Sequence, residues 1–321
     1  MGSSSNPPLI SVICATFNSA ATLRCALDSV LNQDFSDFEV HIIGDACSDD
    51  SEQVVLEKND QRLYWFNLPR NTGSQAQPNN EGLRRARGTY IAFIGHDDLW
   101  MPWHLSRLVK HIKATGADLV HDLVANITPN GAEHAYGPPP TGSDYSRLYV
   151  PPTSWLHRRE LVNEVGYWRD PDDLGWNIDF DYSRRVALAG KNIALEPSLG
   201  VLKFHSAVWR NYSRVGEPPQ QQWLTELLAN PHLVTEKILN ALAVEYARAY
   251  QAHERKPPVR VAWKGAKLAG QDLVKAAIRD LTYLYGPERW PIVEFARRRM
   301  RRFRSRNRIR RGLPSLEDSK L

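Results

Sequence analysis

The sequence contains no long hydrophobic run and few cysteines. No apolar stretch approaches the roughly 18 residues of a membrane-spanning helix, and the first ten residues, MGSSSNPPLI, lack the basic and apolar segments of a secretory signal peptide. The three cysteines, Cys14, Cys25 and Cys47, form no CxxC pair. We therefore expect free thiols in a reducing, cytoplasmic environment rather than a disulfide framework.

A glycine signature for dinucleotide binding is also missing. A dehydrogenase with a Rossmann fold carries G-x-G-x-x-G directly after its first strand. At that place the sequence reads ATFNSAA, in residues 15–21. This difference excludes a Rossmann dehydrogenase.

The composition is that of an ordinary globular protein, but the charge is unevenly distributed. Of the 321 residues, 42% are hydrophobic and 24% are charged, which suits a protein with a buried core. The length allows one large domain or a main domain with an appendage. From Arg255 to the end there are 19 Lys and Arg against 6 Asp and Glu, a net charge of +13, so residues 1–254 carry −8 of the total of +5. An acidic body with a basic tail indicates chemistry in the first part and docking to something anionic in the second.

Short apolar runs alternate with helical patterns in the first part of the chain. This periodicity predicts a mostly parallel α/β sheet with helices on both of its faces. The expected strands are residues 10–15, 38–43, 63–67 and 89–94, and the expected helices are residues 19–31, 49–58 and 75–86.

Past residue 123 the pattern is looser. A helix is expected near residues 158–165, another opens around Trp176 and runs to Gly190, and the chain reads as helical from about Gln220. Proline and glycine predict breaks in this last part at residues 256–258 and 286–287.

Polar residues follow three of the expected strands. Residues 16–18 (Thr-Phe-Asn) follow the first strand, Asp45 the second, and the pair Asp97 and Asp98 the fourth. Ligands of parallel sheets bind outside the carboxyl ends of the strands. We therefore expect a ligand site at this edge.

Two adjacent carboxylates need an explanation of their own. Asp97 and Asp98 repel each other and raise each other's pKa unless a cation or a set of strong donors lies between them. One alternative is a cation site. The other is an acidic turn in which Asp98 caps a helix that begins at Pro102.

Four stretches together resemble an inverting GT-A glycosyltransferase of family 2. They are ISVICATFN, VHIIGDACSDDS, NTGSQAQPNNEGLRRARGTYIAFIGHDDLW and WNIDFDYSRRVALAG, in the order and spacing of that family, and they cover about residues 8–210. The resemblance implies a Rossmann-like GT-A catalytic domain at residues 8–215. Residues 216–321 are then a helical extension with an Arg-rich tail.

The resemblance implies a divalent cation, Mn²⁺ or Mg²⁺, that offsets the charge of a leaving diphosphate. Laid over the DxD motif of the family, Gly95 replaces the first Asp and His96 takes the variable position, so that Asp97 falls on the metal-binding Asp. Asp98 is expected on the turn or the ribose side. His205 lies where related enzymes place a His or Arg near the diphosphate.

Nucleotide recognition is expected from the earlier loops. The resemblance places Thr16, Phe17 and Asn18 beside the base and ribose, and Asp45 on the base edge, where a carboxylate accepts an N–H hydrogen bond. The expected nucleotide-binding residues also include Asn71 and Asn80, which match the N-x-G pattern of the family. Asn79 stands where the family often has a basic residue.

Inverting transfer is a single displacement that needs a base for the acceptor hydroxyl. The family uses the Asp of an ED pair that opens a helix, which corresponds here to Asp179, with Ile178 in place of the Glu. Asp181 is the alternative base, and Trp176 is expected to contact the acceptor sugar. Both carboxylates could also be N-terminal helix residues favoured by the helix dipole.

The tail has an extreme composition. Residues 297–311 hold ten arginines in fifteen positions, and residues 261–284 have an amphipathic helical pattern. A basic amphipathic helix can lie on an anionic membrane surface or bind a partner protein. A solvated disordered tail and a nucleic-acid-binding arm are the alternatives, but no nucleic-acid-binding motif accompanies the arginines.

Taken together, the resemblance implies a metal-dependent glycosyltransferase that acts in polysaccharide biosynthesis. It would move a sugar from a nucleoside-diphosphate donor, with a UDP-sugar favoured, onto a glycan or lipid-linked acceptor with inversion. Its expected location is cytoplasmic, including the inner face of a membrane. The alternative is a module that binds a nucleotide sugar without turnover, because Gly95 and Ile178 each replace an acidic residue of the family.

Overall fold

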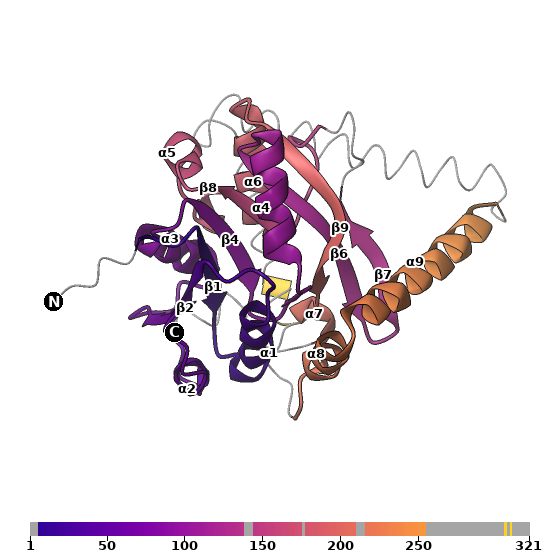
Figure 1. The fold of residues 1–321 in the computed structure, drawn as a ribbon, viewed down its shortest axis with the longest axis horizontal. Coiled ribbons are helices and arrows are strands. Elements are labelled where there is room, and N and C mark those ends of the chain that lie inside the picture. The colour runs from indigo at the N-terminus through magenta and orange to yellow at the C-terminus, as the bar shows by residue number, and fades with distance from the viewer. Residues whose placement is uncertain are drawn as a thin grey trace.

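A computed structural model describes residues 6–137, 144–174, 177–209 and 216–254, together with residues 305, 306 and 309. These residues form one sheet of nine strands in the order β3-β2-β1-β4-β8-β6-β9-β5, with β7 paired to β6 (Figure 1). Among the described residues no helix is long and apolar enough to span a membrane.

The first half of the sheet consists of four parallel strands. It contains β1 (Ile10–Thr16), β2 (Phe38–Gly44), β3 (Leu63–Asn67) and β4 (Tyr90–Gly95). All of their pairings are parallel, so Thr16 lies beside Gly44 at the carboxyl edge. This edge is the one at which the sequence predicts a ligand site.

The second half of the sheet mixes both directions. It contains β5 (Leu99–Trp100), β6 (Leu119–Thr128), β7 (Gly131–Tyr136), β8 (Trp155–Arg158) and β9 (Ile193–Lys203). Strand β8 is antiparallel to both β4 and β6, and β9 is parallel to β6. Strands β6 and β9 therefore run in the same direction as β1 to β4, which confirms a mostly parallel sheet.

Helices cover both faces of the sheet, and side chains of β1 alternate between the two faces. Ile10, Val12 and Cys14 pack beneath α1 (Ala20–Leu31), α2 (Ser51–Glu57) and α4 (His104–Thr115), whereas Ile13 faces the opposite side. On that side lie α3 (Ala76–Arg85), α5 (Leu161–Val165) and α6 (Ile178–Leu188). This period of two residues is the pattern of a strand buried on both faces.

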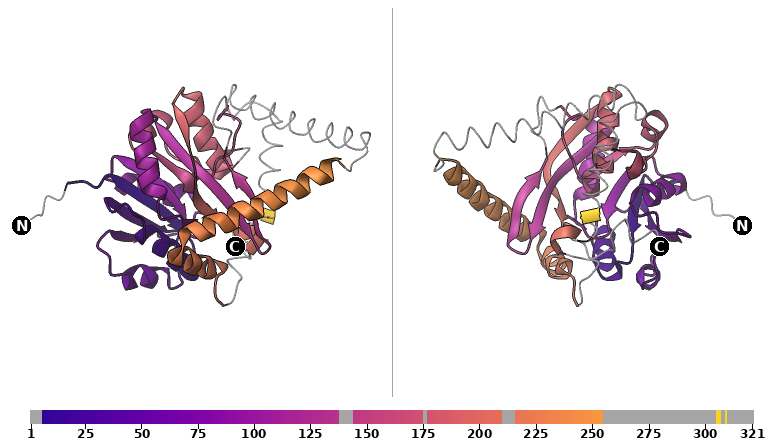
Figure 2. Two further views of the ribbon diagram at one scale, coloured as in Figure 1. Left: turned by 45° about the vertical axis from the view of Figure 1, so that its right-hand side comes forward. Right: turned by 180° about the vertical axis from the view of Figure 1, so that it is seen from behind.

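The remaining helices close one end of the sheet. They are α7 (Ser206–Trp209), α8 (Pro219–Ala229) and α9 (Pro231–Glu254), and short 3₁₀ turns lie at Pro152–Ser154 and Pro171–Asp173. Leu224, Leu227, Val234 and Ile238 of α8 and α9 are buried with Phe204 in one apolar cluster. Helix α9 then runs on past β7 and the body of the molecule (Figure 2).

Most predicted elements are present, with ends that differ by one to three residues. One expected helix was too long, because Arg158 ends β8 and α5 begins only at Leu161. The three cysteines are free, as expected. The domain boundary predicted at residue 215 falls beside residues outside the described ranges. The tail itself, apart from residues 305, 306 and 309, also lies outside them.

Candidate functional site

The loops after β1 and β2 are joined at the carboxyl edge. The Asp45 N–H donates to the Thr16 carbonyl at 2.8 Å, and the Asn18 N–H donates to Cys47 Sγ at 3.4 Å. Asn18 has a left-handed backbone with a φ of 42°, which Asn tolerates better than most residues. Thr16 is buried, and Phe17 and Asn18 are half-buried beside it. The fold thus brings these expected nucleotide residues together.

Asp45 organises the loop that leads to α3. Its Oδ1 accepts hydrogen bonds from the Thr72 N–H and hydroxyl, each at 2.9 Å, and its Oδ2 accepts one from the Gly73 N–H at 3.2 Å. Asn71 Nδ2 donates to the Asp45 carbonyl at 3.0 Å. Two predicted nucleotide residues, Asp45 and Asn71, therefore lie in contact with each other.

Asn80 has a different environment from the one expected. Its Nδ2 donates to the Trp168 carbonyl at 2.8 Å, and its Oδ1 accepts from the Trp168 N–H at 2.9 Å. The residue is 4% exposed. Because both ends of the amide are engaged with backbone, Asn80 fixes the loop around residue 168 to α3. The nucleotide contact suggested by the sequence stays a prediction.

Asp98 is buried in protein contacts. It is 0% exposed; its Oδ2 accepts from Lys203 Nζ at 2.9 Å, and its Oδ1 accepts from the Phe204 N–H at 3.1 Å. Helix α4 begins at His104 with Trp103 in the N-cap position, so Asp98 does not cap it. The expected helix cap is therefore wrong, and Asp98 ties the loop to β9. Its expected place on the ribose side stays a prediction.

Asp97 is held from two other elements. Its Oδ2 accepts from Ser206 Oγ at 2.5 Å, and its main-chain carbonyl accepts from Gln220 Nε2 at 2.9 Å. Ser206 begins α7 and Gln220 lies in the first turn of α8. The loop that carries the expected metal-binding Asp is thus fixed by the residues that follow β9.

The packing at Gly95 explains why the first carboxylate of the family motif is absent. A Cβ at residue 95 would lie 2.7 Å from Asp98 Oδ2 and 3.2 Å from Asp97 Oδ1. Any larger residue would have to displace the buried Asp98 carboxylate. Asp98 Oδ2 therefore fills the space in which a side chain at residue 95 would begin.

Lys203 is a residue of this edge that the sequence prediction missed. It is the last residue of β9, and its side chain is 16% exposed. Burial alone would lower the pKa of Lys203, but the charges of Asp98, Asp97 and Asp179 outweigh burial and raise it, so the ammonium stays charged. The signal in the sequence was a single lysine in the apolar run 199–204.

Asp179 lies in the first turn of α6, where Asn177 caps the helix through a 2.9 Å bond from the Asp179 N–H. Its Oδ1 accepts from Gln75 Nε2, and its Oδ2 accepts from Tyr149 Oη at 3.3 Å. Burial raises the pKa of Tyr149 well above its ordinary value, and the charge of Asp179 adds to this effect. Tyr149 therefore stays a neutral donor. Neither Gln75 nor Tyr149 was anticipated.

Asp181 has the surroundings of a structural residue. It is 2% exposed and accepts from Arg185 Nε at 2.8 Å, and Arg169 Nη1 lies 3.6 Å from its other oxygen. Arg185 also donates to the carbonyls of Gly166 and Tyr167. The alternative base is thus part of a buried ion pair that ties α6 to the loop before it.

His205 follows Lys203 on the same segment. Its Nε2 lies 2.9 Å from the hydroxyl of Tyr136 at the end of β7. A cation at His205 would therefore use the other ring nitrogen. Trp176, expected to contact the acceptor, lies outside the described residues.

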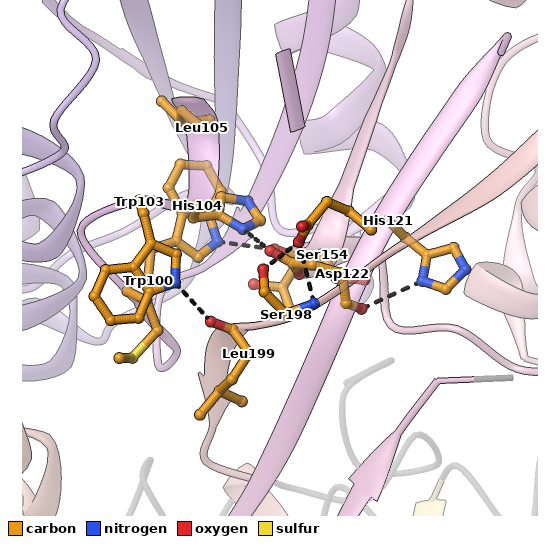
Figure 3. Close-up of polar contacts among 12 residues, drawn as sticks. Trp100, Trp103, His104, Leu105, His121, Asp122, Ser154, Ser198 and Leu199 are labelled. Atoms are coloured by element: carbon orange, nitrogen blue, oxygen red, sulfur yellow. Dashed lines mark hydrogen bonds and ion pairs between the residues drawn. The ribbon is translucent and has the colours of Figure 1, made fainter. Parts of the chain in front are cut away.

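A buried polar layer, formed by His104 and Asp122, lies at the start of α4. His104 Nδ1 and Asp122 Oδ2 are 2.6 Å apart, and both residues are at most 1% exposed (Figure 3). Gly200 of β9 lies so close that a Cβ there would be 1.5 Å from Asp122 Oδ2. The pair lies between β9 and the helix that follows residues 97 and 98.

The side chains of this edge supply few ligands for a cation. Within the described ranges, no group of three or more His, Cys, Asp or Glu residues could hold a metal ion. Asp97 Oδ1 lies 3.2 Å from the position that a Cβ at residue 95 would take. The donor set fits a divalent cation when Asp97 supplies one oxygen and a bound diphosphate supplies others, as hard cations prefer.

Residues 11–164 match the family model described as Glycosyl transferase family 2. Over 106 residues the chain is 39% identical to GalNAc(5)-diNAcBac-PP-undecaprenol beta-1,3-glucosyltransferase of Campylobacter jejuni, covering 32% of this chain and 34% of the relative. It is 31% identical over 222 residues to the succinoglycan biosynthesis protein ExoO of Rhizobium meliloti, covering 61% of this chain and 62% of that protein. The chain thus spans about a third of the first relative and less than two thirds of the second.

Solved structures share the fold. The crystal structure of S. aureus TarS 1-349 in complex with UDP superposes with a TM-score of 0.53 at 21% identity, over 68% of this chain and 70% of TarS 1-349. The fold is thus the Rossmann-like GT-A fold that the sequence resemblance implies. Residues 11–164 thus carry a segment of glycosyl transferase family 2.

Proposed function

We propose that this chain transfers one sugar from a nucleoside-diphosphate donor to a glycan or lipid-linked acceptor, with inversion at the anomeric carbon. The observation that carries the proposal is the meeting of two groups of side chains at one edge of the sheet. Asp97 lies on the loop after β4, and its neighbour Asp98 accepts a hydrogen bond from Lys203. Asp179, at the start of α6, accepts from Tyr149, whose ring contacts Tyr136. The Tyr136 hydroxyl in turn lies 2.9 Å from His205 Nε2. Donor and acceptor chemistry thus come within reach of one another.

A uridine donor is favoured. The structure of TarS that shares this fold contains UDP, and a second contains UDP-GlcNAc. In the proposed complex, the nucleoside lies against Phe17, Asn18 and Asp45, and the diphosphate points toward Asp97. The Asp45 carboxylate is held by Thr72 and Gly73, so its position beside this loop is fixed.

The transfer is a single displacement. Asp179 takes the proton of the acceptor hydroxyl while its oxygen forms a bond to the anomeric carbon, and the bond to the diphosphate breaks with its electron pair on the leaving oxygen. Gln75 and Tyr149 donate to the two Asp179 oxygens and hold the carboxylate in place.

Asp97 and His205 would hold a divalent cation, Mn²⁺ or Mg²⁺. Such an ion supplies positive charge to the departing diphosphate. Asp98 does not enter this set, because both of its oxygens are engaged by Lys203 and Phe204.

A lipid-linked acceptor would place the protein at the cytoplasmic face of a membrane. The relative from Campylobacter jejuni is named for an undecaprenol-linked substrate. The ten arginines of residues 297–311 would then bind anionic headgroups, each contributing about 1 kcal/mol near the surface.

The test is release of UDP from UDP-sugars in the presence of extracted lipid-linked glycans, compared between wild type and Asp179→Asn. Loss of the base should lower turnover by about 10²- to 10⁴-fold, while UDP affinity in calorimetry stays within about threefold. Asp181→Asn serves as the comparison for damage to α6. Equal turnover in wild type and Asp179→Asn would remove Asp179 as base, and no turnover by wild type with normal UDP binding would favour a binding module.

A further inference from the structure

Lys203 contacts the loop after β4, the loop at which the proposed function places the donor diphosphate. Its ammonium is 2.9 Å from Asp98 Oδ2, and the charges of Asp97 and Asp179 both act on it. In a displacement the breaking bond lies between the base on one side and the diphosphate on the other. Tyr149, which donates to Asp179, contacts the ring of Tyr136. The Tyr136 hydroxyl lies 2.9 Å from His205 Nε2, two residues after Lys203, so the end of β9 is close to the side chains around Asp179.

The ammonium has unused hydrogen-bonding capacity. A lysine carries three N–H donors, and within the described residues Lys203 makes one hydrogen bond, to Asp98. Its side chain is 16% exposed, whereas that of Asp98 is 0% exposed. Lys203 can thus face a ligand, while Asp98 lies behind it and fixes its position.

Both carboxylate oxygens of Asp98 help to hold Lys203 in position. One oxygen binds the ammonium and the other binds the N–H of Phe204, the next residue in the chain. The end of β9 is therefore attached to the loop after β4 at two adjacent points. Gly95 leaves the room that this inward Asp98 needs.

We infer that Lys203 is a phosphate-binding residue, whose ammonium, fixed by Asp98, donates to the diphosphate of the donor nucleotide and offsets part of its charge. The inference rests on the proposed function. It explains how an edge that has lost one carboxylate of the family motif can still bind a diphosphate. The Lys203 side chain then supplies part of the positive charge that offsets the diphosphate, and a metal ion supplies only the rest.

The experiment compares two variants that differ only in the ammonium. Asp98→Asn keeps the lysine, and the double variant Lys203→Met with Asp98→Asn removes it without leaving a buried carboxylate unpaired, which would itself cost stability. UDP and uridine are titrated calorimetrically into each, in EDTA and in Mn²⁺. Lys237→Met on the surface of α9 is the control for loss of a lysine elsewhere, and thermal unfolding checks each fold.

In EDTA we expect Asp98→Asn to bind UDP and the double variant to bind it at least about tenfold more weakly, the range of one charge-assisted hydrogen bond. Uridine, which has no phosphate, should bind both variants equally, and Lys203→Arg should retain UDP binding. Equal UDP affinities in the two variants, or UDP binding by wild type only when Mn²⁺ is present, would overturn the role of Lys203 and leave the proposed function standing. Absence of UDP and GDP binding in every form, with Mn²⁺ present, would overturn both.

Discussion

Asp97 and Asp98 are adjacent carboxylates that the fold places in different surroundings. Asp98 is neutralised inside the protein by Lys203 and by the N–H of Phe204. Asp97 receives a hydroxyl bond from Ser206. Burial raises the pKa of the Asp98 carboxyl, and the Lys203 ammonium opposes this effect. The repulsion expected from the sequence is therefore relieved by a lysine of the chain itself.

Replacement of Gly95 by aspartate tests this packing at the scale of one residue. The change restores the carboxylate of the family motif, but its Cβ would begin 2.7 Å from Asp98 Oδ2. We expect a loss of about 1 to 3 kcal/mol in the free energy of unfolding and no gain in Mn²⁺ affinity. Urea unfolding and calorimetry measure both quantities, with Gly95→Ala as the smaller step. A more stable Gly95→Asp protein that binds Mn²⁺ more tightly would show that Asp98 does not hold this space.

The elements of the first half of the sheet are the ones that the sequence predicts well. Strands β1 to β4 have the apolar runs of buried parallel strands, and their ends match within one or two residues. Strand β6 was not anticipated, because His121, Asp122 and Asn126 interrupt its apolar pattern although all three are buried. Their partners, such as His104 for Asp122, are distant in sequence. Periodicity cannot reveal such pairs.

The contact between β9 and the buried polar layer gives a prediction at the scale of elements. Gly200→Ala would place a Cβ 1.5 Å from Asp122 Oδ2, so we expect a loss of about 3 kcal/mol in the free energy of unfolding. In an Asp122→Ala background the same change should cost much less, because the clashing carboxylate is gone. Urea unfolding of wild type, Gly200→Ala, Asp122→Ala and the double variant gives the coupling energy between the two positions. Equal costs in the two backgrounds would mean that the clash is relieved by movement of β9.

The site shows the same division between what the sequence reveals and what it does not. The loops after β1, β2 and β4 could be located because each follows a recognisable strand. Asn80 and Asp181 were assigned to ligand chemistry, but their contacts with Trp168 and Arg185 were not anticipated. Lys203 went unnoticed because its importance depends on β9 lying beside β5, a pairing of residues about a hundred positions apart.

At the scale of the whole molecule, the packed part of the chain extends beyond the segment that matches the family. Val234 and Ile238 of α9 are buried in a cluster with Phe204, the residue between Lys203 and His205. Strands and helices on both sides of residue 164 therefore hold the candidate site together.

Removal of residues 255–321 should separate the basic tail from the acidic body. We expect a chain of residues 1–254 to fold, because it keeps the buried cluster that α8 and α9 form with Phe204. Binding to vesicles with anionic lipid should fall strongly, since 19 of the 41 Lys and Arg residues are lost. Cosedimentation with vesicles of phosphatidylglycerol, against neutral phosphatidylcholine vesicles, measures this loss. Equal binding by the two chains would remove the tail as the membrane-binding segment.

The most direct test of the whole account is calorimetric titration of UDP in the presence of Mn²⁺ into wild type, Asp97→Asn and Asp179→Asn. Asp97 is placed at the diphosphate and Asp179 at the acceptor. The account therefore predicts that Asp97→Asn weakens UDP binding by about tenfold or more, whereas Asp179→Asn leaves it within about threefold. Binding that is unaffected by Asp97→Asn, or abolished by Asp179→Asn in a folded protein, would contradict the assignment of donor and acceptor sides.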